Sequence, residues 1–324
     1  MTRVLVIGGG QSAEHDVSLA GAAGVAAALR KGGFGVEELT IGRDGCWRRG
    51  AAVLGASAVQ SMGPALETMG GVDVVFPVLH GPNGEDGALA ALCALAGVPM
   101  VGSDLRAGAI GMDKWATKLV AEAVGIRTAR GVLVSRADIG DVEFDGPVVV
   151  KPVAAGSSHG VTLVTEAAQL QDALHRAARF DDRILVEEVV HGREVDVSVL
   201  REDGARWASP PLEIHAAAAD GSAMFDTATK YDGSARFTTP ADLTGSERRV
   251  LSTAAVRMFD ALGCSGVARI DFFLTADGPV LNEVNTTPGM SAQSQVPRMF
   301  QAVGIGYPEL VARMVRAATA GSPR

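Results

Sequence analysis

The chain has 324 residues, of which 47% are apolar and 20% charged, so it is long enough for two or three compact lobes. Its 29 Lys and Arg against 37 Asp and Glu give a net charge of −8, which argues against a broad nucleic-acid or anionic-membrane surface. Its cysteines are scattered without a Cys-x-x-Cys motif, which excludes a disulfide framework and a thiolate zinc site. No apolar run reads as a signal peptide or a bilayer span, so we expect a cytoplasmic protein.

The N-terminal third has the pattern of a parallel α/β lobe. A buried strand over 3–7 leads into the glycine-rich turn 8–13, a helix to about residue 30 and a second strand over 35–41. The Gly-x-Gly-x-x-Ala spacing of that turn matches the dinucleotide fingerprint, which leaves a nicotinamide or flavin enzyme as an alternative. The helix opens with Glu14, however, and a carboxylate there repels a pyrophosphate but suits an ammonium group.

Further segments extend this lobe. We predict strands over 72–79 and 98–101 and helices over 87–96 and 107–124. His80 follows the first of these strands, at the carboxyl edge where open α/β sheets bind ligands, although a self-capped loop is the alternative.

From residue 126 the pattern changes to short strands interrupted by one clear helix over 167–178, which is typical of a separate α+β lobe. Residues 151–160, Lys-Pro-Val-Ala-Ala-Gly-Ser-Ser-His-Gly, lie between two of these strands and suit a loop whose N–H groups close over phosphate oxygens. The same loop matches the Gly-x-Ser-x-Gly elbow of serine hydrolases. That elbow must run from a strand into a helix, whereas 161–164 is β-branched and predicts a strand.

Two acidic or polar segments suggest nucleotide contacts. The connector 186–190 could recognise an adenine edge and Glu194 a ribose hydroxyl; an exposed acidic connector is the alternative. The polar loop 216–236, which contains Lys230 and Tyr231, has the length of a functional lid. No Walker motif occurs, which excludes a P-loop enzyme.

The segment 267–285 concentrates hard oxygen ligands. Two apolar runs, 267–274 and 279–284, flank a short loop with glycine and predict a β-hairpin. Glu283 and Asn285 are two apart and share a face, and Asp271 can lie opposite them. Two carboxylates and one amide oxygen suit Mg²⁺, which takes its other ligands from water and phosphate. The alternative is a solvated hairpin face.

Six motifs, taken together in chain order, resemble the D-alanine–D-alanine ligases of the ATP-grasp superfamily, from residue 4 to about 315. They are Ser-Ala-Glu-His at 12–15, His-Gly-x-x-Gly-Glu-Asp-Gly at 80–87, Met-Asp-Lys at 112–114, Lys-Tyr at 230–231, Arg-Ile-Asp at 269–271 and Glu-Val-Asn-Thr-Thr-Pro-Gly-Met at 283–290. The resemblance implies a three-lobed ATP-grasp fold of mixed α/β and α+β class. Its lobes would be a Rossmann-like, parallel-sheet N-terminal domain over 1–116, a central lobe over 117–194, and a C-terminal lobe over 195–324 with the metal site and the lid.

The resemblance also implies the reaction. Two D-alanines are expected to be joined through an acyl phosphate at the expense of ATP, in a cytoplasmic, homodimeric enzyme of peptidoglycan precursor synthesis. Two Mg²⁺ or Mn²⁺ ions are expected on Asp271, Glu283 and Asn285. The expected ATP contacts are Lys114, Lys151, Ser157, Ser158, Glu187, Glu188, Val190, Glu194, Lys230, Asn282 and Glu283.

The amino-acid sites follow from the same resemblance. Glu14, oriented by Ser157 and Tyr231, is expected to hold the first D-alanine with His80 beside it. Arg269 and the Gly289 N–H are expected to meet the oxyanion, and Ser294 and Gln295 the second substrate. The chain departs from the family pattern at Ala155, where an acidic residue is common, and in the Thr-Ala-Thr before Lys230. Ligases for D-serine, D-lactate or another amino acid are therefore the alternative, although Tyr231 favours the dipeptide.

Overall fold

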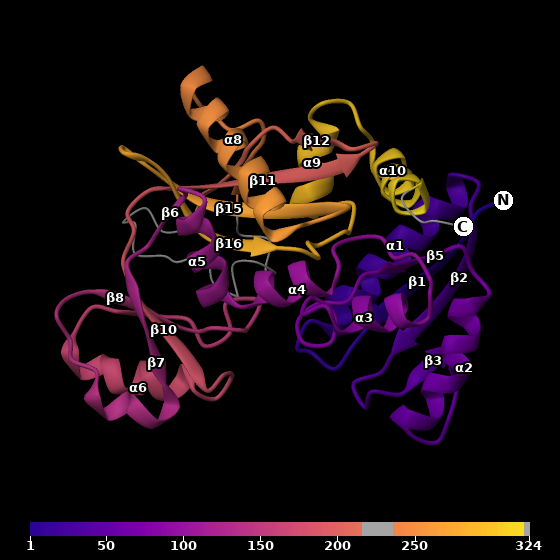
Figure 1. Ribbon diagram of the computed structural model, residues 1–324, viewed down its shortest axis with the longest axis horizontal. Helices are drawn as coiled ribbons and strands as arrows, with labels where there is room; N and C mark the ends of the chain where they lie inside the picture. Colours follow the sequence, from indigo (N-terminus) through magenta and orange to yellow (C-terminus); the bar gives the residue numbers. More distant parts are fainter. Residues whose placement is uncertain (216–235, 321–324) are drawn as a thin grey trace.

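A computed structural model describes residues 1–215 and 236–320, and the strands of these residues form three sheets (Figure 1). The expected lid therefore lies outside the described residues, except for its last residue, Arg236. Lys230 and Tyr231 lie outside them too.

The N-terminal lobe contains the predicted parallel sheet. Its elements are β1 (Arg3–Gly9), α1 (His15–Lys31), β2 (Gly35–Ile41), β3 (Trp47–Arg49), β4 (Ala52–Val53), α2 (Ala58–Gly70), β5 (Val74–Pro77) and α3 (Ala88–Leu95). β1 pairs in parallel with both β2 and β5, and the short β3 and β4 extend the sheet in antiparallel fashion. Side chains of β1 are buried on both faces, as its continuous apolar run predicts. The strand predicted over 98–101 is only a single bridge between Val75 and Met100.

The helix predicted over 107–124 is two helices, α4 (Leu105–Met112) and α5 (Lys114–Ala123). Asp113 causes the break, because its backbone is extended and its side chain accepts a hydrogen bond from the N–H of Ala116. Periodicity alone missed this interruption, since both helices continue the same apolar pattern. The break places Lys114 on the first turn of α5.

The middle sheet is antiparallel, in the order β7-β10-β8-β9. Its elements are β7 (Gly131–Ser135), a 3₁₀ turn η1 (Arg136–Asp141), β8 (Val148–Pro152), β9 (Thr162–Val164), α6 (Ala167–Ala177) and β10 (Arg183–Glu188). α6 covers one face, where Val150 and Ile184 are buried with Leu174. The alternating residues Val149, Lys151 and Glu187 face the other way, into a cavity. The loop 153–161 joins strand to strand, so it is not a hydrolase elbow.

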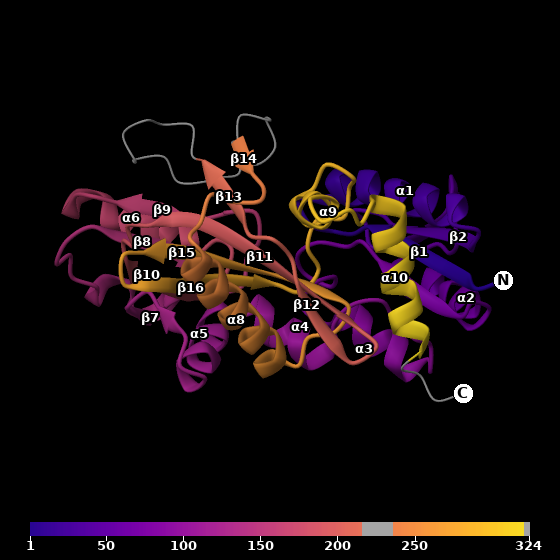
Figure 2. The ribbon, with the colours of Figure 1, turned by 90° about the horizontal axis from the view of Figure 1, so that it is seen from above.

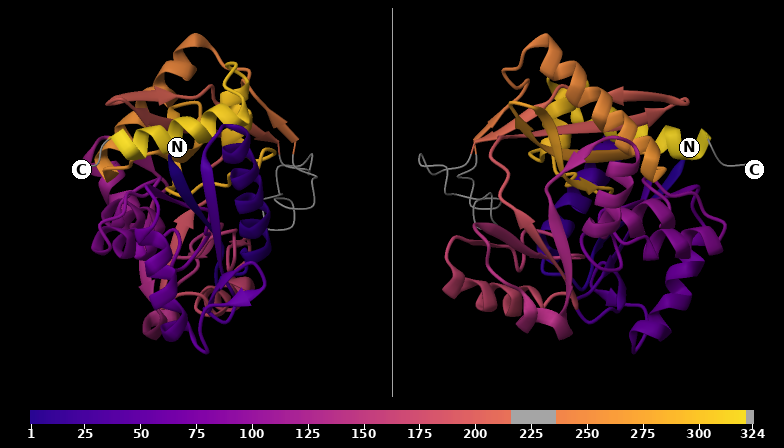
Figure 3. Two further views of the ribbon diagram at one scale, coloured as in Figure 1. Left: turned by 90° about the vertical axis from the view of Figure 1, so that its right-hand side faces the viewer. Right: turned by 60° about the vertical axis from the view of Figure 1, so that its left-hand side comes forward.

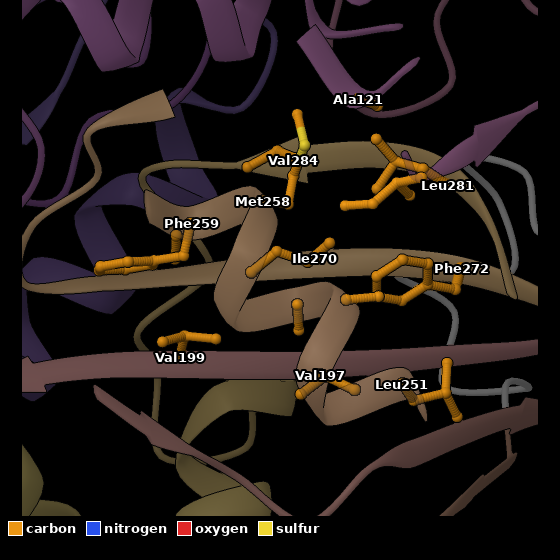
Figure 4. Close-up of a cluster of buried hydrophobic side chains, with 14 of the residues drawn as sticks. Ala121, Val197, Val199, Leu251, Met258, Phe259, Ile270, Phe272, Leu281 and Val284 are labelled. Carbon is orange, nitrogen blue, oxygen red and sulfur yellow. The ribbon is translucent and has the colours of Figure 1, made fainter. Parts of the chain in front are cut away.

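The third sheet contains the predicted hairpin. Its path β14-β13-β11-β15-β16-β6 is built from β6 (Arg127–Thr128), β11 (Arg193–Glu202), β13 (Leu212–His215), β14 (Arg236–Thr238), β15 (Val267–Thr275) and β16 (Gly278–Asn285), with β12 (Ala205–Ala208) beside β11. One face packs on α8 (Gly245–Leu262), where Met258 and Phe259 contribute to a core that includes Ile270 (Figure 4). A fully buried side chain of this size stabilises the fold by about 1.5–3 kcal/mol. The opposite face therefore presents Arg269 and Asp271.

The C-terminal helices return to the start of the chain. α9 (Gln295–Gln301) follows the hairpin, and α10 (Tyr307–Ala320) packs against α1 and β5 (Figures 2 and 3). One buried cluster includes both Val25 of α1 and Leu310 of α10. No helix within the described residues has the length and apolar character needed to cross a membrane.

Candidate active site

The β15–β16 hairpin places the predicted oxygen ligands in register. Asp271 pairs with Glu283, and Arg269 pairs with Asn285. The register then shifts, so that Phe272 pairs with Leu281 and Asn282 is the extra residue of a β-bulge. The sequence pattern had predicted the opposition of Asp271 and Glu283 but not the bulge.

Arg269 lies at the centre of a buried charge network. Its Nε and Nη2 donate to the two carboxylate oxygens of Asp271, each at 2.7 Å, and its Nε is 3.3 Å from Oδ2 of Asp196. Burial alone would lower the pKa of the guanidinium, but the neighbouring carboxylates outweigh burial and raise it. Gln295 Nε2 donates to the same Asp196 oxygen at 3.0 Å, which connects the start of α9 to this network.

The hairpin's donor set fits a divalent cation that is shared with a substrate. Among the described residues no three His, Cys, Asp or Glu side chains form a metal cluster by themselves. Asp271 and Glu283 supply two carboxylates, and the amide of Asn285 donates to Asp271 Oδ2 at 2.9 Å. A site with so few protein ligands suits Mg²⁺, which completes its shell with water and phosphate oxygens.

One cavity of about 560 Å³ lies between the middle and third sheets. Nine residues expected to contact ATP line it: Lys114, Lys151, Ser158, Glu187, Glu188, Val190, Glu194, Asn282 and Glu283. Asp271 also lines it. Its walls combine the apolar Val149, Leu163 and Leu281 with lysines and carboxylates, as a site for a base and its phosphates requires.

Glu187 lines this cavity and lies between two lysines. Lys118 Nζ donates to its Oε1, and Lys151 Nζ is 2.5 Å from its Oε2. Burial would raise the pKa of the Glu187 carboxyl, but the two ammonium groups outweigh burial and lower it. The carboxylate is therefore ionised across the physiological range.

A second cavity, of about 410 Å³, lies between the N-terminal lobe and the hairpin. It is lined by Glu14, His80, Asn285, Gly289, Ser294 and Gln295, together with Ser157 of the loop that follows β8. Glu14 accepts a hydrogen bond from Ser157 Oγ. This bond joins the N-terminal lobe, which contains Glu14, to the loop of the middle sheet that contains Ser157. Ser157 and Ser158 both have positive φ, 48° and 57°, which turns the loop sharply at this point.

His80 lies in the wall of the second cavity and is 5% exposed. Its Nδ1 is 3.5 Å from Oε1 of Glu85. Burial would lower the imidazole pKa, but Glu85 and, more distantly, Glu14 outweigh burial and raise it. These charges give this end of the cavity an acidic wall that suits an ammonium group.

The two cavities share four lining residues, Lys114, Ala155, Arg269 and Glu283. Lys114 Nζ donates to the carbonyl of Ala155 at 2.8 Å and is 3.7 Å from Oε2 of Glu283. A ligand in one cavity can therefore meet a ligand in the other beside a lysine and an arginine. This arrangement suits transfer of an anionic group between two bound molecules.

Several charged residues of this site were not predicted from the sequence. Lys118 is four residues after Lys114 on the same helix face, and Asp196 is two after Glu194 in the same strand. Glu85 was within a quoted motif without a role, and Arg298 also lines the second cavity. The spacing relative to residues already chosen was the available signal for Lys118 and Asp196.

Comparisons with known proteins agree with this geometry. The family model described as D-ala D-ala ligase N-terminus matches residues 3–103, and that described as D-ala D-ala ligase C-terminus matches residues 135–316. The D-alanine–D-alanine ligase of Mycolicibacterium smegmatis is 41% identical over 360 aligned positions, covering 98% of this chain and 96% of that protein. The Streptomyces avermitilis enzyme of the same name is 39% identical, covering 98% and 94%.

Solved structures are similar over the same extent. The VanG D-Ala:D-Ser ligase of Enterococcus faecalis has a TM-score of 0.81 at 29% identity and covers 98% of this chain and 99% of that one. The D-alanine–D-alanine ligase of Coxiella burnetii has a TM-score of 0.79 at 28% identity, covering 98% and 94%. The fold expected from the sequence is thereby confirmed, and the chain belongs to the D-alanine–D-alanine ligase family.

Proposed function

We propose that the protein joins two D-alanine molecules into D-alanyl-D-alanine at the expense of ATP, for the synthesis of peptidoglycan precursors. The observation that carries this proposal is the meeting of the two cavities at Lys114, Arg269 and Glu283. One cavity has cationic groups for phosphates, and the other has carboxylates for an ammonium group. Family membership favours this ligation over the nicotinamide, flavin and serine-hydrolase alternatives.

The chemistry requires both cavities. The carboxylate of the first D-alanine attacks the γ-phosphorus of ATP, an O–P bond forms and ADP leaves. The free amine of the second D-alanine then attacks the acyl carbon; the C–N bond forms, the C–O bond to phosphate breaks, and the amine loses a proton. Phosphate is a far better leaving group than hydroxide, which is why ATP is consumed first. The protein's task is to position the reactants and stabilise charge.

On the nucleotide side, Asp271, Glu283 and Asn285 would hold two Mg²⁺ or Mn²⁺ ions. When bound, these ions neutralise charge on the phosphate oxygens. Lys114 and Lys151 contact phosphates, assisted by Ser157 and Ser158 from the loop that follows β8. Glu187 and Val190 contact adenine, Glu194 contacts the ribose, and Glu188 and Asn282 are further ATP contacts. All of these residues except Ser157 and Asn285, which line the second cavity, lie around one cavity, and this supports the assignments.

On the amino-acid side, Glu14 holds the ammonium group of the first D-alanine, and Ser157 orients Glu14 by the hydrogen bond described above. His80 lies beside this site. Arg269 and the Gly289 N–H stabilise the oxyanion of the tetrahedral intermediate. Ser294 and Gln295 receive the carboxylate of the second D-alanine.

The wider organisation follows the same family. We propose lobes over 1–116, 117–194 and 195–324, a lid over 216–236 with Lys230 and Tyr231, and a homodimer acting in the cytoplasm. The lid's purpose would be to exclude water, because water hydrolyses an acyl phosphate.

The test measures phosphate release from ATP and Mg²⁺ with D-alanine, L-alanine, D-serine or D-lactate, alone and in pairs with D-alanine, and identifies products by mass spectrometry. We expect release with D-alanine alone and a product with the mass of D-alanyl-D-alanine. Turnover only when D-serine or D-lactate accompanies D-alanine would retain the mechanism and replace the second substrate. No release in any mixture would reject the proposed function.

A further inference from the structure

Lys118 is a buried lysine behind the cavity of about 560 Å³, which we call the nucleotide cavity because the proposed function places ATP there. It lies on α5, is 5% exposed, and does not line the cavity that Lys151 and Glu187 line. Its Nζ donates to the backbone carbonyl of Ala129 and to Oε1 of Glu187. Lys118 therefore meets Glu187 from the protein side and reaches a bound nucleotide only through its two partners, Glu187 and Ala129, which both line the cavity.

Lys151 meets the same carboxylate from the cavity side. Its Nζ is 2.5 Å from Oε2 of Glu187, and both residues are about as buried as Lys118, at 6% and 5% exposed. Within residues 1–215 and 236–320, Lys118 and Lys151 are the charged groups that contact Glu187. The strand neighbours of Glu187 on either side, Gly131 and Val149, carry no charge. The three groups form a buried cluster with one more positive charge than negative.

When ATP binds, its phosphates and Glu187 would compete for the ammonium group of Lys151. The proposed function assigns Lys151 to the phosphates, yet in the structure its ammonium group is paired with Glu187. If Lys151 turned away from an otherwise unpaired Glu187, a buried carboxylate would lose its counter-charge, which is strongly unfavourable. The carboxyl would then take up a proton, because burial disfavours its charged form. Lys118 removes this conflict, because it remains on Oε1.

We propose that Lys118 is a positioning residue that keeps Glu187 ionised while Lys151 exchanges from Glu187 to the ATP phosphates, so that this cluster binds ATP without taking up a proton. The inference rests on the proposed function, since it requires a nucleotide in this cavity. It assigns the two lysines different roles: Lys151 is the mobile contact and Lys118 the fixed counter-charge.

Calorimetry of Mg-ATP binding, without D-alanine, tests the proposal on the full chain. Binding heats in buffers of different ionisation enthalpy give the number of protons taken up. In Lys118→Met the pKa of Glu187 rises when ATP draws Lys151 away, so binding takes up as much as one proton more than in the wild type. In the variant, Glu187 has one pKa without ATP and a higher pKa with ATP bound. Between these two values the apparent Kd for Mg-ATP should rise by as much as about tenfold per pH unit relative to the wild type.

Two further variants separate this role from a structural one. Lys118→Arg retains the charge and should match the wild type in proton uptake. Lys118→Met/Glu187→Gln has no carboxylate to compensate, so the extra proton should disappear. An extra proton that persists in the double variant would overturn the proposal.

The remaining outcomes distinguish the inference from the function on which it rests. If Lys118→Met weakens Mg-ATP binding equally at every pH with no extra proton, Lys118 only anchors α5 to the Ala129 connector, and the inference is wrong while the function stands. If the wild-type protein does not bind Mg-ATP at all, the proposed function fails and the inference with it.

Discussion

The two ends of the nucleotide cavity carry opposite charge imbalances. At one end, Lys151 from the cavity side and Lys118 from behind share the single carboxylate of Glu187. At the hairpin, the carboxylates of Asp271 and Asp196 contact the single guanidinium of Arg269. Buried charges without a balance are costly, so each excess indicates what the bound state supplies. Phosphates would complete the first cluster, and divalent cations the second.

Each cluster has one ion whose charge is opposite to that of its two partners: Glu187 in the first and Arg269 in the second. This ion, the minority ion of its cluster, is the one whose charge is held most firmly. The lysines lower the pKa of Glu187, and the carboxylates raise the pKa of Arg269. All four of Glu187, Arg269, Lys151 and Asp271 line the cavity, so position alone does not separate the minority ions from the majority groups. The charge imbalance means that one majority group can turn to a bound ligand while the other keeps the minority ion paired.

Removing the minority ion of the hairpin should have the largest effect. Arg269→Met leaves Asp271 and Asp196 without their shared counter-charge, so we expect a loss of about 3–5 kcal/mol in the free energy of unfolding. Loss of an oxyanion donor should also lower turnover by about 10²–10³-fold. Denaturant unfolding and phosphate release measure the two effects.

A matched control is Arg206→Met, which breaks the partly exposed 2.7 Å pair with Asp260. It should change stability by no more than about 1 kcal/mol and leave turnover unaltered. Equal stability losses in the two variants would show that burial does not distinguish the hairpin cluster.

Neutralising a majority group of the hairpin should act through the metal. In Asp271→Asn one carboxylate ligand is lost while Asp196 still compensates Arg269. We expect turnover to fall on the order of 100-fold, equivalent to about 3 kcal/mol, with partial recovery at high Mg²⁺. A titration of turnover against Mg²⁺ concentration measures this, and a half-saturation identical to the wild type would contradict the metal assignment.

Adjacent serines should mark the boundary between the two cavities. Ser157 lines the amino-acid cavity and donates to Glu14, whereas Ser158 lines the nucleotide cavity. Loss of one hydrogen bond costs about 1 kcal/mol, so Ser157→Ala should raise the KM for D-alanine about fivefold. Ser158→Ala should instead raise the KM for ATP. Steady-state kinetics with each substrate varied measure both KM values. Identical KM shifts in the two variants would show that the two serines do not serve different substrates.

The smallest expected effect is the pH dependence from His80. Because Glu85 and Glu14 raise its pKa in the folded state, the charged imidazole contributes stability that is fully present below its ordinary pKa of 6.5. That contribution is lost as pH rises through the raised pKa. Unfolding free energies of the wild type and His80→Asn should therefore converge from neutral toward alkaline pH. A difference that grows with pH would mean that burial, not the carboxylates, controls His80.

Local patterns predicted much of the fold because each needs only neighbouring residues. Alternation placed Asp271, Glu283 and Asn285 on a hairpin, and the β-branched run after Ser158 correctly excluded a helix there. The break at Asp113 was missed because an N-cap inside an unbroken apolar pattern reads as one more polar helix residue.

Assembly of the site depended on contacts that no local pattern contains. Glu14 and Ser157 are 143 residues apart in the chain, and only the family resemblance connected them before the structure. Lys118 reads in sequence as an ordinary solvated helix lysine. Its burial depends on the carbonyl of Ala129 and on Glu187, which tertiary packing alone brings to it.

The packing of α10 on α1 has a consequence for biosynthesis. Val4 and Val25, made early, are buried together with Leu310 and Val315, made nearly 300 residues later. A nascent chain that ends before Tyr307 therefore leaves that apolar face of the first lobe open to water and to other proteins. The lobe that holds Glu14 can finish folding only after α10 has been translated, and chaperones that bind exposed apolar surface would meet this protein through that lobe.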